Sequence, residues 1–118
     1  MDPETWLYSK IIATPTVYGF SLKKEELPVF LIEGNNAKTL VTTRRIIEIS
    51  GIERKEISII DIDDIIYGDF KGRPNKPSMS IFRTIDLYGD ELNFQLETGA
   101  ASVGLITSLN TLINLISE

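Results

Sequence analysis

The sequence contains neither cysteine nor histidine. Without cysteine there can be no disulfide, thiolate metal site or thiol nucleophile. Without histidine the chain lacks the commonest general base and the commonest transition-metal ligand. Carboxylates, lysine, tyrosine and serine remain, but no base accompanies the hydroxyl groups, and the glycines lack the spacing of a phosphate-binding loop. We therefore predict a protein that is not an enzyme and that uses no cofactor or metal.

Positive charge is also scarce, with 12 lysines and arginines against 17 aspartates and glutamates and a net charge of -5. Binding to nucleic acid needs a basic face, so nucleic acid is not an expected partner. An anionic membrane is disfavoured less strongly, because a local basic patch can act against the overall sign. The initial MDPETWLYSK has no long apolar core, and no run approaches the roughly 18 apolar residues of a spanning helix. These absences predict a cytoplasmic protein.

The 118 residues that are present fit a single domain, since 42% are hydrophobic and 25% are charged. A chain of this length buries roughly two-thirds of its unfolded surface, so it can hold a core without disulfides. We expect one domain over 1–118, made of a leading segment, 1–26, and a folded core, 27–117. Asp2-Pro3 suits a helix start, so the stretch from Glu4 to Ile12 predicts a short N-terminal helix.

Short apolar runs separated by turn residues indicate about seven antiparallel β-strands. The Gly-Asn-Asn at 34–36 and the Gly-Asp at 89–90 are typical of tight turns. Leu92, Phe94 and Leu96 alternate with polar residues, as in a half-buried strand. The predicted extended segments are Pro28–Glu33, Lys38–Ser50, Glu56–Ile62, Ile65–Phe70, Met79–Tyr88 and Glu91–Glu97.

The last element has helical periodicity. Apolar residues recur at spacings of three and four, which predicts an amphipathic helix from about Ala100 to Ile116. The expected fold class is therefore mainly β (α+β), with the strands curled into a barrel or sandwich and closed by this helix. The predicted apolar stripe of the helix is Val103, Ile106, Leu109, Ile113 and Ile116, with Leu105, Leu112 and Leu115 beside it.

The other face of this helix carries no charge, since none occurs between Glu97 and Glu118. Exposed helices usually carry charges. Either this face is covered, by the leading segment or by a second subunit, or the surface simply tolerates uncharged residues. If it is covered, the candidate interface residues are Trp6, Leu7, Ile11, Asn110 and Asn114.

One strand and its surroundings resemble the bacterial pleckstrin-homology-like (PH-like) domains. The stretch LVTTRRIIEISG (40–51) is followed by an acidic corner, IDIDDII (60–66), then by strands and a final helix. The resemblance covers roughly residues 27–117 and implies a bent, partly open antiparallel barrel with a helix plugging one end. The residues that match the strand pattern are Leu40, Val41, Thr42, Arg45, Ile46 and Ile47.

The resemblance implies no particular ligand. In phosphoinositide-binding pleckstrin domains, basic residues line the first hairpin loop. Here the corresponding loop, 34–38, carries only Lys38, and Glu33 lies beside it. Fold alone does not assign a function.

Arg44 and Arg45 are adjacent within a predicted strand. Adjacent strand residues point to opposite faces, so the two cannot clamp one anion together. We expect one of them to pack its stem near the core and to pair with a carboxylate, while the other faces water. The alternative is an anion-binding site that includes Arg44.

The segment KGRPNKPS (71–78) is a predicted loop and the most basic part of the chain. Lys71, Arg73 and Lys76 are candidates for binding a phosphate, an acidic protein or a lipid head group, with a solvated loop as the alternative. The acidic DIDD (61–64) breaks the alternation of a calcium loop. We expect it to be a strand corner whose side chains accept local N–H groups.

Together these features predict a non-catalytic binding or assembly module that works with a protein partner or with itself. Strand addition at an exposed edge and docking beside the last helix are the expected modes. The alternative is a peripheral membrane or anionic-ligand binder that uses the basic loop at 71–77.

Overall fold

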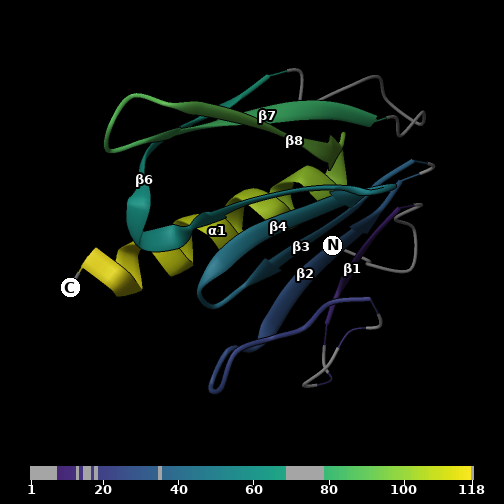
Figure 1. Ribbon diagram of the computed structural model, residues 1–118. Helices are drawn as coiled ribbons and strands as arrows, with labels where there is room; N and C mark the ends of the chain where they lie inside the picture. Colours follow the sequence, from purple (N-terminus) through teal and green to yellow (C-terminus); the bar gives the residue numbers. More distant parts are fainter. Residues whose placement is uncertain are drawn as a thin grey trace.

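The computed structural model describes residues 8–12, 14, 17, 19–34, 36–68 and 79–117. They form two antiparallel sheets and one helix, and in Figure 1 the helix lies between the sheets. The first sheet has the order β1 (Ser9–Ile11), β2 (Pro28–Glu33), β3 (Lys38–Thr42), β4 (Arg45–Ser50) and β5 (Glu53–Ser58). A 3-10 turn, η2 (Ile59–Asp61), leads to the second sheet, with the order β6 (Ile62–Tyr67), β7 (Met79–Asp86) and β8 (Glu91–Glu97). The chain continues into α1 (Ala100–Ser117), so the predicted mainly β class with a closing helix is confirmed.

The hydrophobic core lies between the inner faces of the two sheets and is closed by α1. The rings of Phe82 and Phe94 stack at its centre with centroids 5.5 Å apart. Leu105 and Leu109 of the helix pack into the same cluster. The other members are Phe30, Ile32, Val41, Ile46, Ile57, Ile59, Leu96, Ala101 and Leu112. One continuous core therefore joins both sheets to α1.

The first sheet is buried on its outer face as well. Leu31, Leu40 and Ile47 are paired in register across β2, β3 and β4, and all three are buried. Because side chains alternate along a strand, these three face away from Phe30 and Ile46. Burial on both faces explains why PVFLIE in β2 is a nearly continuous apolar run, whereas β8 alternates.

The predicted N-terminal helix is wrong over its described part. Ser9–Ile11 is strand β1, which pairs antiparallel with β2 in the register Ser9↔Ile32 and Ile11↔Phe30. The N–H of Ile12 donates to the carbonyl of Val29 at 3.0 Å. Ile11 and Ile12 are β-branched and favour extended backbone. The edge of β2 supplies hydrogen bonds to this strand, whereas an isolated helix of this length would be only marginally stable.

The predicted long strand Lys38–Ser50 is two strands joined by a tight turn. The hydroxyl of Thr42 accepts the N–H groups of Arg44 and Arg45, both at 3.0 Å, and this local bonding reverses the chain at Thr43-Arg44. The premise that both arginines lie within one strand is therefore wrong. The later strand predicted at Glu56–Ile62 is also displaced, since β5 begins at Glu53 after a turn at Gly51, whose φ is 61°.

The predicted buried stripe of α1 is only partly right. Leu109 is buried, but Val103 is 47% exposed and Ile116 is 38% exposed. The buried side chains include Leu105 and Leu112, which were predicted to lie beside the stripe, and also Ala101. Apolar residues occur in adjacent pairs along this helix, so two neighbouring stripes fit the sequence equally well, and packing against the sheets selects one of them.

Candidate functional site

Arg45, at the start of β4, lies at the centre of a buried ion-pair network. Its Nε and Nη2 donate to the two carboxylate oxygens of Glu26 at 2.8 and 3.1 Å. Nη1 donates to Glu56 Oε2 at 2.7 Å, and Nη2 also donates to the carbonyl of Ser21 at 2.9 Å. Only 7% of the Arg45 side chain is exposed. The expectation that one arginine pairs with a carboxylate is confirmed for Arg45.

The carboxylate of Glu26 is completely buried and well bonded. It accepts the hydroxyl of Thr42 at 2.6 Å and the N–H of Lys23 at 2.8 Å in addition to Arg45. Burial acts to raise the pKa of Glu26, but the hydrogen bonds and the charge of Arg45 outweigh it, so the pKa lies below its usual value of 4.5. The Glu26 carboxylate in turn raises the pKa of Arg45. The guanidinium is committed to this network and does not serve as an anion site.

The same network holds the segment around residues 21–27 against the β3–β4 turn. Thr43 N–H donates to the carbonyl of Leu27 at 2.9 Å, and Leu27 N–H donates to the hydroxyl of Thr43 at 3.1 Å. Lys23 and Glu26 form a tight turn in which the N–H of Glu26 donates to the carbonyl of Lys23 at 3.0 Å. Glu25 occupies this turn with a φ of 67°, a conformation that usually favours glycine.

Arg44 differs from its neighbour, because it is exposed and its side chain forms no ion pair with any described residue. It lines a hollow of about 600 Å³, which we call the Arg44 pocket. The pocket combines cationic and aliphatic side chains from the leading segment, the β3–β4 turn, η2 and the end of α1. Its lining residues are Lys23, Glu25, Thr43, Arg44, Arg45, Ser58, Ile60 and Ile116.

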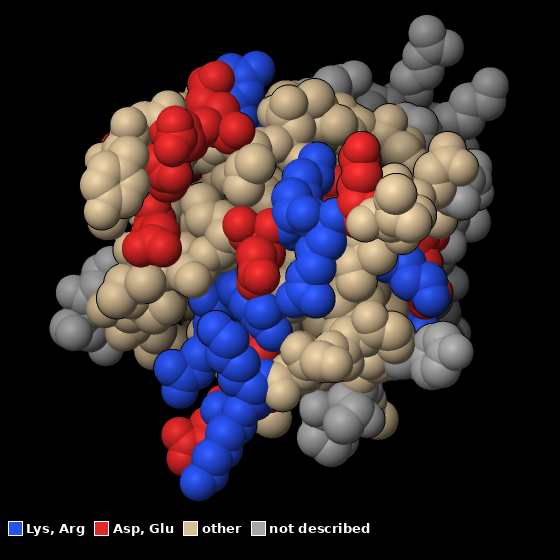
Figure 2. Space-filling model, in the orientation of Figure 1, with Lys and Arg blue, Asp and Glu red and all other residues tan. Residues whose placement is uncertain are grey.

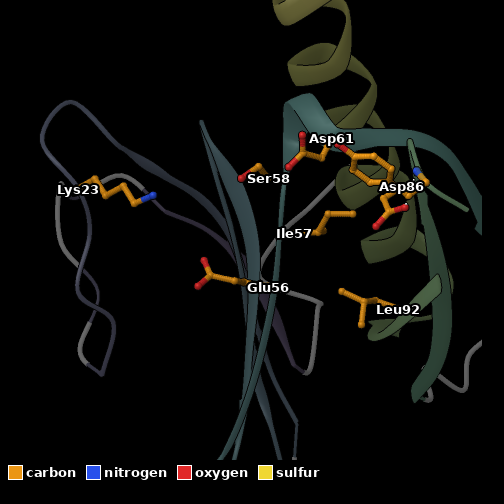
Figure 3. A pocket seen from close by; sticks show the side chains of 8 residues that line it. Lys23, Glu56, Ile57, Ser58, Asp61, Asp86 and Leu92 are labelled. Atoms are coloured by element: carbon orange, nitrogen blue, oxygen red, sulfur yellow. Dashed lines mark hydrogen bonds between the residues drawn. The ribbon is translucent and has the colours of Figure 1, made fainter. Parts of the chain in front are cut away.

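A second hollow of about 400 Å³ lies between β5 and the β7–β8 hairpin, and we call it the β5 cleft. Figure 3 shows β5 with Glu56 and Ser58 on one side of it and Asp86 and Leu92 on the other. The remaining lining residues are Lys23, Ile57, Asp61 and Tyr88. The cleft is therefore bounded on one side by β5 and on the other by an acidic and aromatic hairpin.

Strand β5 is the edge of the first sheet, and β4 is its only strand neighbour in the described part of the chain. Beyond its end, Ile59 N–H donates to the carbonyl of Arg44 at 2.8 Å. Backbone N–H and C=O groups point alternately to the two sides of a strand, so every second residue counted back from Ile59, namely Ile57, Lys55 and Glu53, bonds to β4. Arg54, Glu56 and Ser58 alternate with these residues and turn their N–H and C=O groups away from β4. Glu56 and Ser58 also line the β5 cleft.

A buried polar group that the sequence did not indicate joins the two sheets on the inner side. Glu48 accepts the hydroxyl of Thr39 at 2.7 Å and the N–H of Gln95 at 2.9 Å, and it pairs with Lys55 at 3.0 Å. The amide of Gln95 also donates to the carbonyl of Ala37 at 2.9 Å. These bonds engage the edge of β8, which leaves β5 as the more open of these two edges.

The polar face predicted for β8 is only partly a solvent face, since Asn93 is exposed but the two residues that follow it on this face are not. Gln95 is half-buried, and Glu97 is almost completely buried and accepts the N–H of Tyr8 at 2.8 Å. Strict alternation located the apolar face correctly, but it gave no sign that Gln95 and Glu97 of the polar face bond to the first sheet and to Tyr8.

The acidic corner does not form a metal site in the part of the chain that the structure describes, where no group of three or more potential ligands is close enough to hold an ion. Asp64 Oδ1 instead accepts the N–H of Ile65 at 2.8 Å, as expected for a strand corner. Asp61 lines the β5 cleft.

The candidate residues from the sequence are separated in the fold. Ile11, Asn110 and Asn114 are exposed, with Ile11 on β1 and the two asparagines on α1. Trp6 and Leu7 lie outside the described residues. Lys71, Arg73 and Lys76 lie outside them as well. Of the predicted anion-binding residues, only Arg44 can be placed, and it lies in a pocket whose other members the sequence did not bring together.

The distribution of charge on this side of the molecule is uneven. Figure 2 shows lysine and arginine side chains in a band across the middle, with acidic side chains gathered above and to the left of it. Exposed cations that belong to elements around β5 are Lys23, Lys24, Arg44 and Arg54. Acidic residues of the β7–β8 hairpin are Asp86, Asp90 and Glu91.

Comparison with family models, with curated proteins and with solved structures found no match to this chain. Among the described residues, no helix has both the length and the apolar character needed to cross a bilayer. The features of the described residues that bear on function are the two hollows and the edge of β5.

Proposed function

We propose that the chain is a PH-like domain with a non-catalytic role: it binds an extended segment of another protein as an extra strand along β5. The order of elements supports the family assignment, because the β2–β5 meander, the β6–β8 meander and the closing α1 follow the order that the resemblance implies. One observation carries the binding mode, namely the open edge of β5 beside the β5 cleft.

Strand addition uses main-chain hydrogen bonds for affinity and neighbouring pockets for specificity. The outward backbone groups of Arg54, Glu56 and Ser58 supply the hydrogen bonds. The β5 cleft receives the side chains of the added segment that point toward the β7–β8 hairpin. Four charged residues in succession, 53–56, disfavour pairing with arbitrary apolar strands, so the edge selects a segment with complementary charges.

The open edge has a direct signature in amide hydrogen exchange. The amides of Arg54, Glu56 and Ser58 should exchange with solvent faster than those of Lys55 and Ile57, which bond to β4. Binding of an added strand should slow the first three amides and leave the other two unchanged. Equal exchange of all five amides in the free protein would contradict the assigned phase of the ladder.

Ser58 offers a variant that blocks the edge without disturbing the sheet. Its φ is -73°, within the range that proline adopts, and its N–H points away from β4. Ser58→Pro removes the last outward donor and places ring atoms where an added strand would lie. Ser58→Ala is the matched control, because it removes the hydroxyl and keeps the N–H.

The test uses a random peptide library displayed on phage and selected on the immobilised protein. Peptides selected on the native protein should bind Ser58→Ala with native affinity and bind Ser58→Pro at least about tenfold more weakly, the effect of losing one main-chain bond and gaining a steric clash. Circular dichroism and urea unfolding should show that both variants are folded. Equal binding to the two variants would contradict strand addition at β5.

A second copy of the chain is another source of the added strand. Sedimentation of the native protein and of Ser58→Pro tests this source of the strand. If two copies pair through β5, the native protein should sediment as an oligomer and Ser58→Pro as a monomer.

A further inference from the structure

The β5 cleft and the Arg44 pocket are adjacent hollows. Lys23 and Ser58 line both of them, and Ser58 is the last residue of β5. A segment that lies along β5 in the direction from Glu53 to Ser58 therefore leads into the Arg44 pocket. The chemistry of this pocket determines what the end of such a segment must carry.

The Arg44 pocket joins unpaired cations to exposed aliphatic groups. Lys23 and Arg44 form no ion pair with any described residue, whereas Arg45 is committed to its network. Ile60 is 66% exposed and Ile116 is 38% exposed, although both are large apolar residues. Glu25 is the single carboxylate among the described residues of the lining. Lys23 and Arg44 together outweigh it, so a net positive charge lies beside an apolar surface.

The backbone positions of both cations are fixed. The N–H of Lys23 donates to Glu26 at 2.8 Å, and the N–H of Arg44 donates to the hydroxyl of Thr42 at 3.0 Å. Glu26 and Thr42 are themselves buried and bonded to each other at 2.6 Å. A site whose residues are held by a second set of hydrogen bonds loses less conformational freedom on binding.

We propose that the Arg44 pocket receives the free C-terminus of the segment that adds to β5, an inference that rests on the proposed function. The terminal carboxylate lies between Lys23 and Arg44, and an aliphatic last side chain packs against Ile60 and Ile116. A chain terminus carries a carboxylate and a side chain on one α-carbon, which matches a pocket that places cations beside apolar groups. The added strand then runs parallel to β5.

An anionic bilayer is the other occupant with a matching charge, and two features oppose it. The chain as a whole has a net charge of -5. Two uncommitted cations near an anionic surface provide only weak attraction. A peptide terminus needs only the local charge of the pocket and gains the hydrogen bonds of the β5 edge.

The probe is a synthetic pool of short acetylated peptides with randomised interior positions and leucine as the last residue. It is prepared with a free terminal carboxylate and, separately, with a terminal carboxamide. We expect the native protein to bind the carboxylate pool at least about tenfold more tightly, as for hydrogen bonds to a charged group. Arg44→Gln and Lys23→Gln should each reduce this ratio, and the double variant should abolish it.

Lys24→Gln is the matched control. Lys24 is an exposed cation of the leading segment that lines neither hollow and does not belong to β5, so its loss should leave the ratio of carboxylate to carboxamide binding unchanged. A third pool ending in serine tests the apolar half of the site. The native protein should prefer leucine over serine, and Ile60→Ser should remove that preference.

The outcomes separate this inference from the proposed function. If both pools bind equally and Ser58→Pro blocks both, strand addition stands and the C-terminal assignment is overturned. If the double variant Arg44→Gln/Lys23→Gln still prefers the carboxylate pool over the carboxamide pool, the terminal carboxylate does not bind in the Arg44 pocket. If neither pool binds, both proposals fail. Vesicles of phosphatidylserine and phosphatidylcholine that bind in an Arg44-dependent manner, without any carboxylate preference among peptides, would overturn the inference in favour of a lipid head group.

Discussion

The buried network around Arg45 makes a quantitative prediction, because its exposed neighbour Arg44 provides a control one residue away. Arg45→Met removes every hydrogen bond of the guanidinium and leaves Glu26 with only Thr42 and the N–H of Lys23. The Glu26 side chain has no exposed surface to hydrate instead. Breaking a buried ion pair costs about 3–5 kcal/mol. Since two hydrogen bonds to Glu26 survive, we expect a loss of about 3 kcal/mol in the free energy of unfolding.

Urea unfolding followed by circular dichroism measures this loss. A domain is typically stable by about 5–15 kcal/mol, so the variant should remain folded in water. Arg44→Met should change the free energy of unfolding by less than about 0.5 kcal/mol, as for most exposed sites. Glu26→Gln should destabilise the native protein and yet partly restore Arg45→Met, because it removes the buried charge that the first substitution leaves unpaired.

Two results would refute this reasoning. If Arg44→Met and Arg45→Met were equally destabilising, the assignment of one exposed and one buried arginine would be wrong. If Glu26→Gln simply added its own loss to that of Arg45→Met, the two side chains would not be energetically coupled.

Three further predictions concern pH, a turn and the helix. The pKa of Glu26 is lower in the folded protein than its ordinary value of 4.5, so the stability that this carboxylate contributes is complete above pH 4.5 and is lost as the pH falls through the folded pKa. Between these pH values the free energy of unfolding should fall more steeply for the native protein than for Glu26→Gln. Parallel curves for the two proteins would contradict this prediction. Glu25→Gly should raise the free energy of unfolding by about 0.5–1 kcal/mol. The strain that a positive φ imposes on glutamate is larger than the entropic cost of ordering glycine, so removing the strain gives a net gain. A loss of stability would show that the turn is not strained. Leu109→Ala should lower the free energy of unfolding by about 2–5 kcal/mol, because Leu109 is buried. Leu115→Ala, at an exposed site, should lower it by less than about 1 kcal/mol. If urea unfolding gave the reverse order, α1 would be rotated about its axis.

Strands with a clear local signal were predictable from the sequence. The Gly89-Asp90 turn and the alternation in β8 identify a hairpin correctly, and PVFLIE identifies β2. The errors occur where a local signal competes with a distant one. Ser9–Ile11 forms a strand because β2 lies beside it, which the local helical spacing cannot indicate.

The site was less accessible to sequence reasoning than the fold. Pairing of one arginine with a carboxylate was predictable, because a buried guanidinium needs a counter-charge. The partner was not, since Glu26 lies 19 residues earlier in a segment without clear periodicity. The Arg44 pocket combines η2, the β3–β4 turn and the end of α1, and its formation depends on packing that no single stretch encodes.

The position of α1 at the close of both sheets has a consequence for synthesis on the ribosome. Its buried residues, Ala101 to Leu112, complete a core whose other members all precede them in the chain. Until those residues leave the exit tunnel, the apolar inner faces of the two sheets are not covered where α1 packs in the folded protein. The nascent chain therefore passes through a stage in which chaperones that recognise exposed apolar strands should hold it.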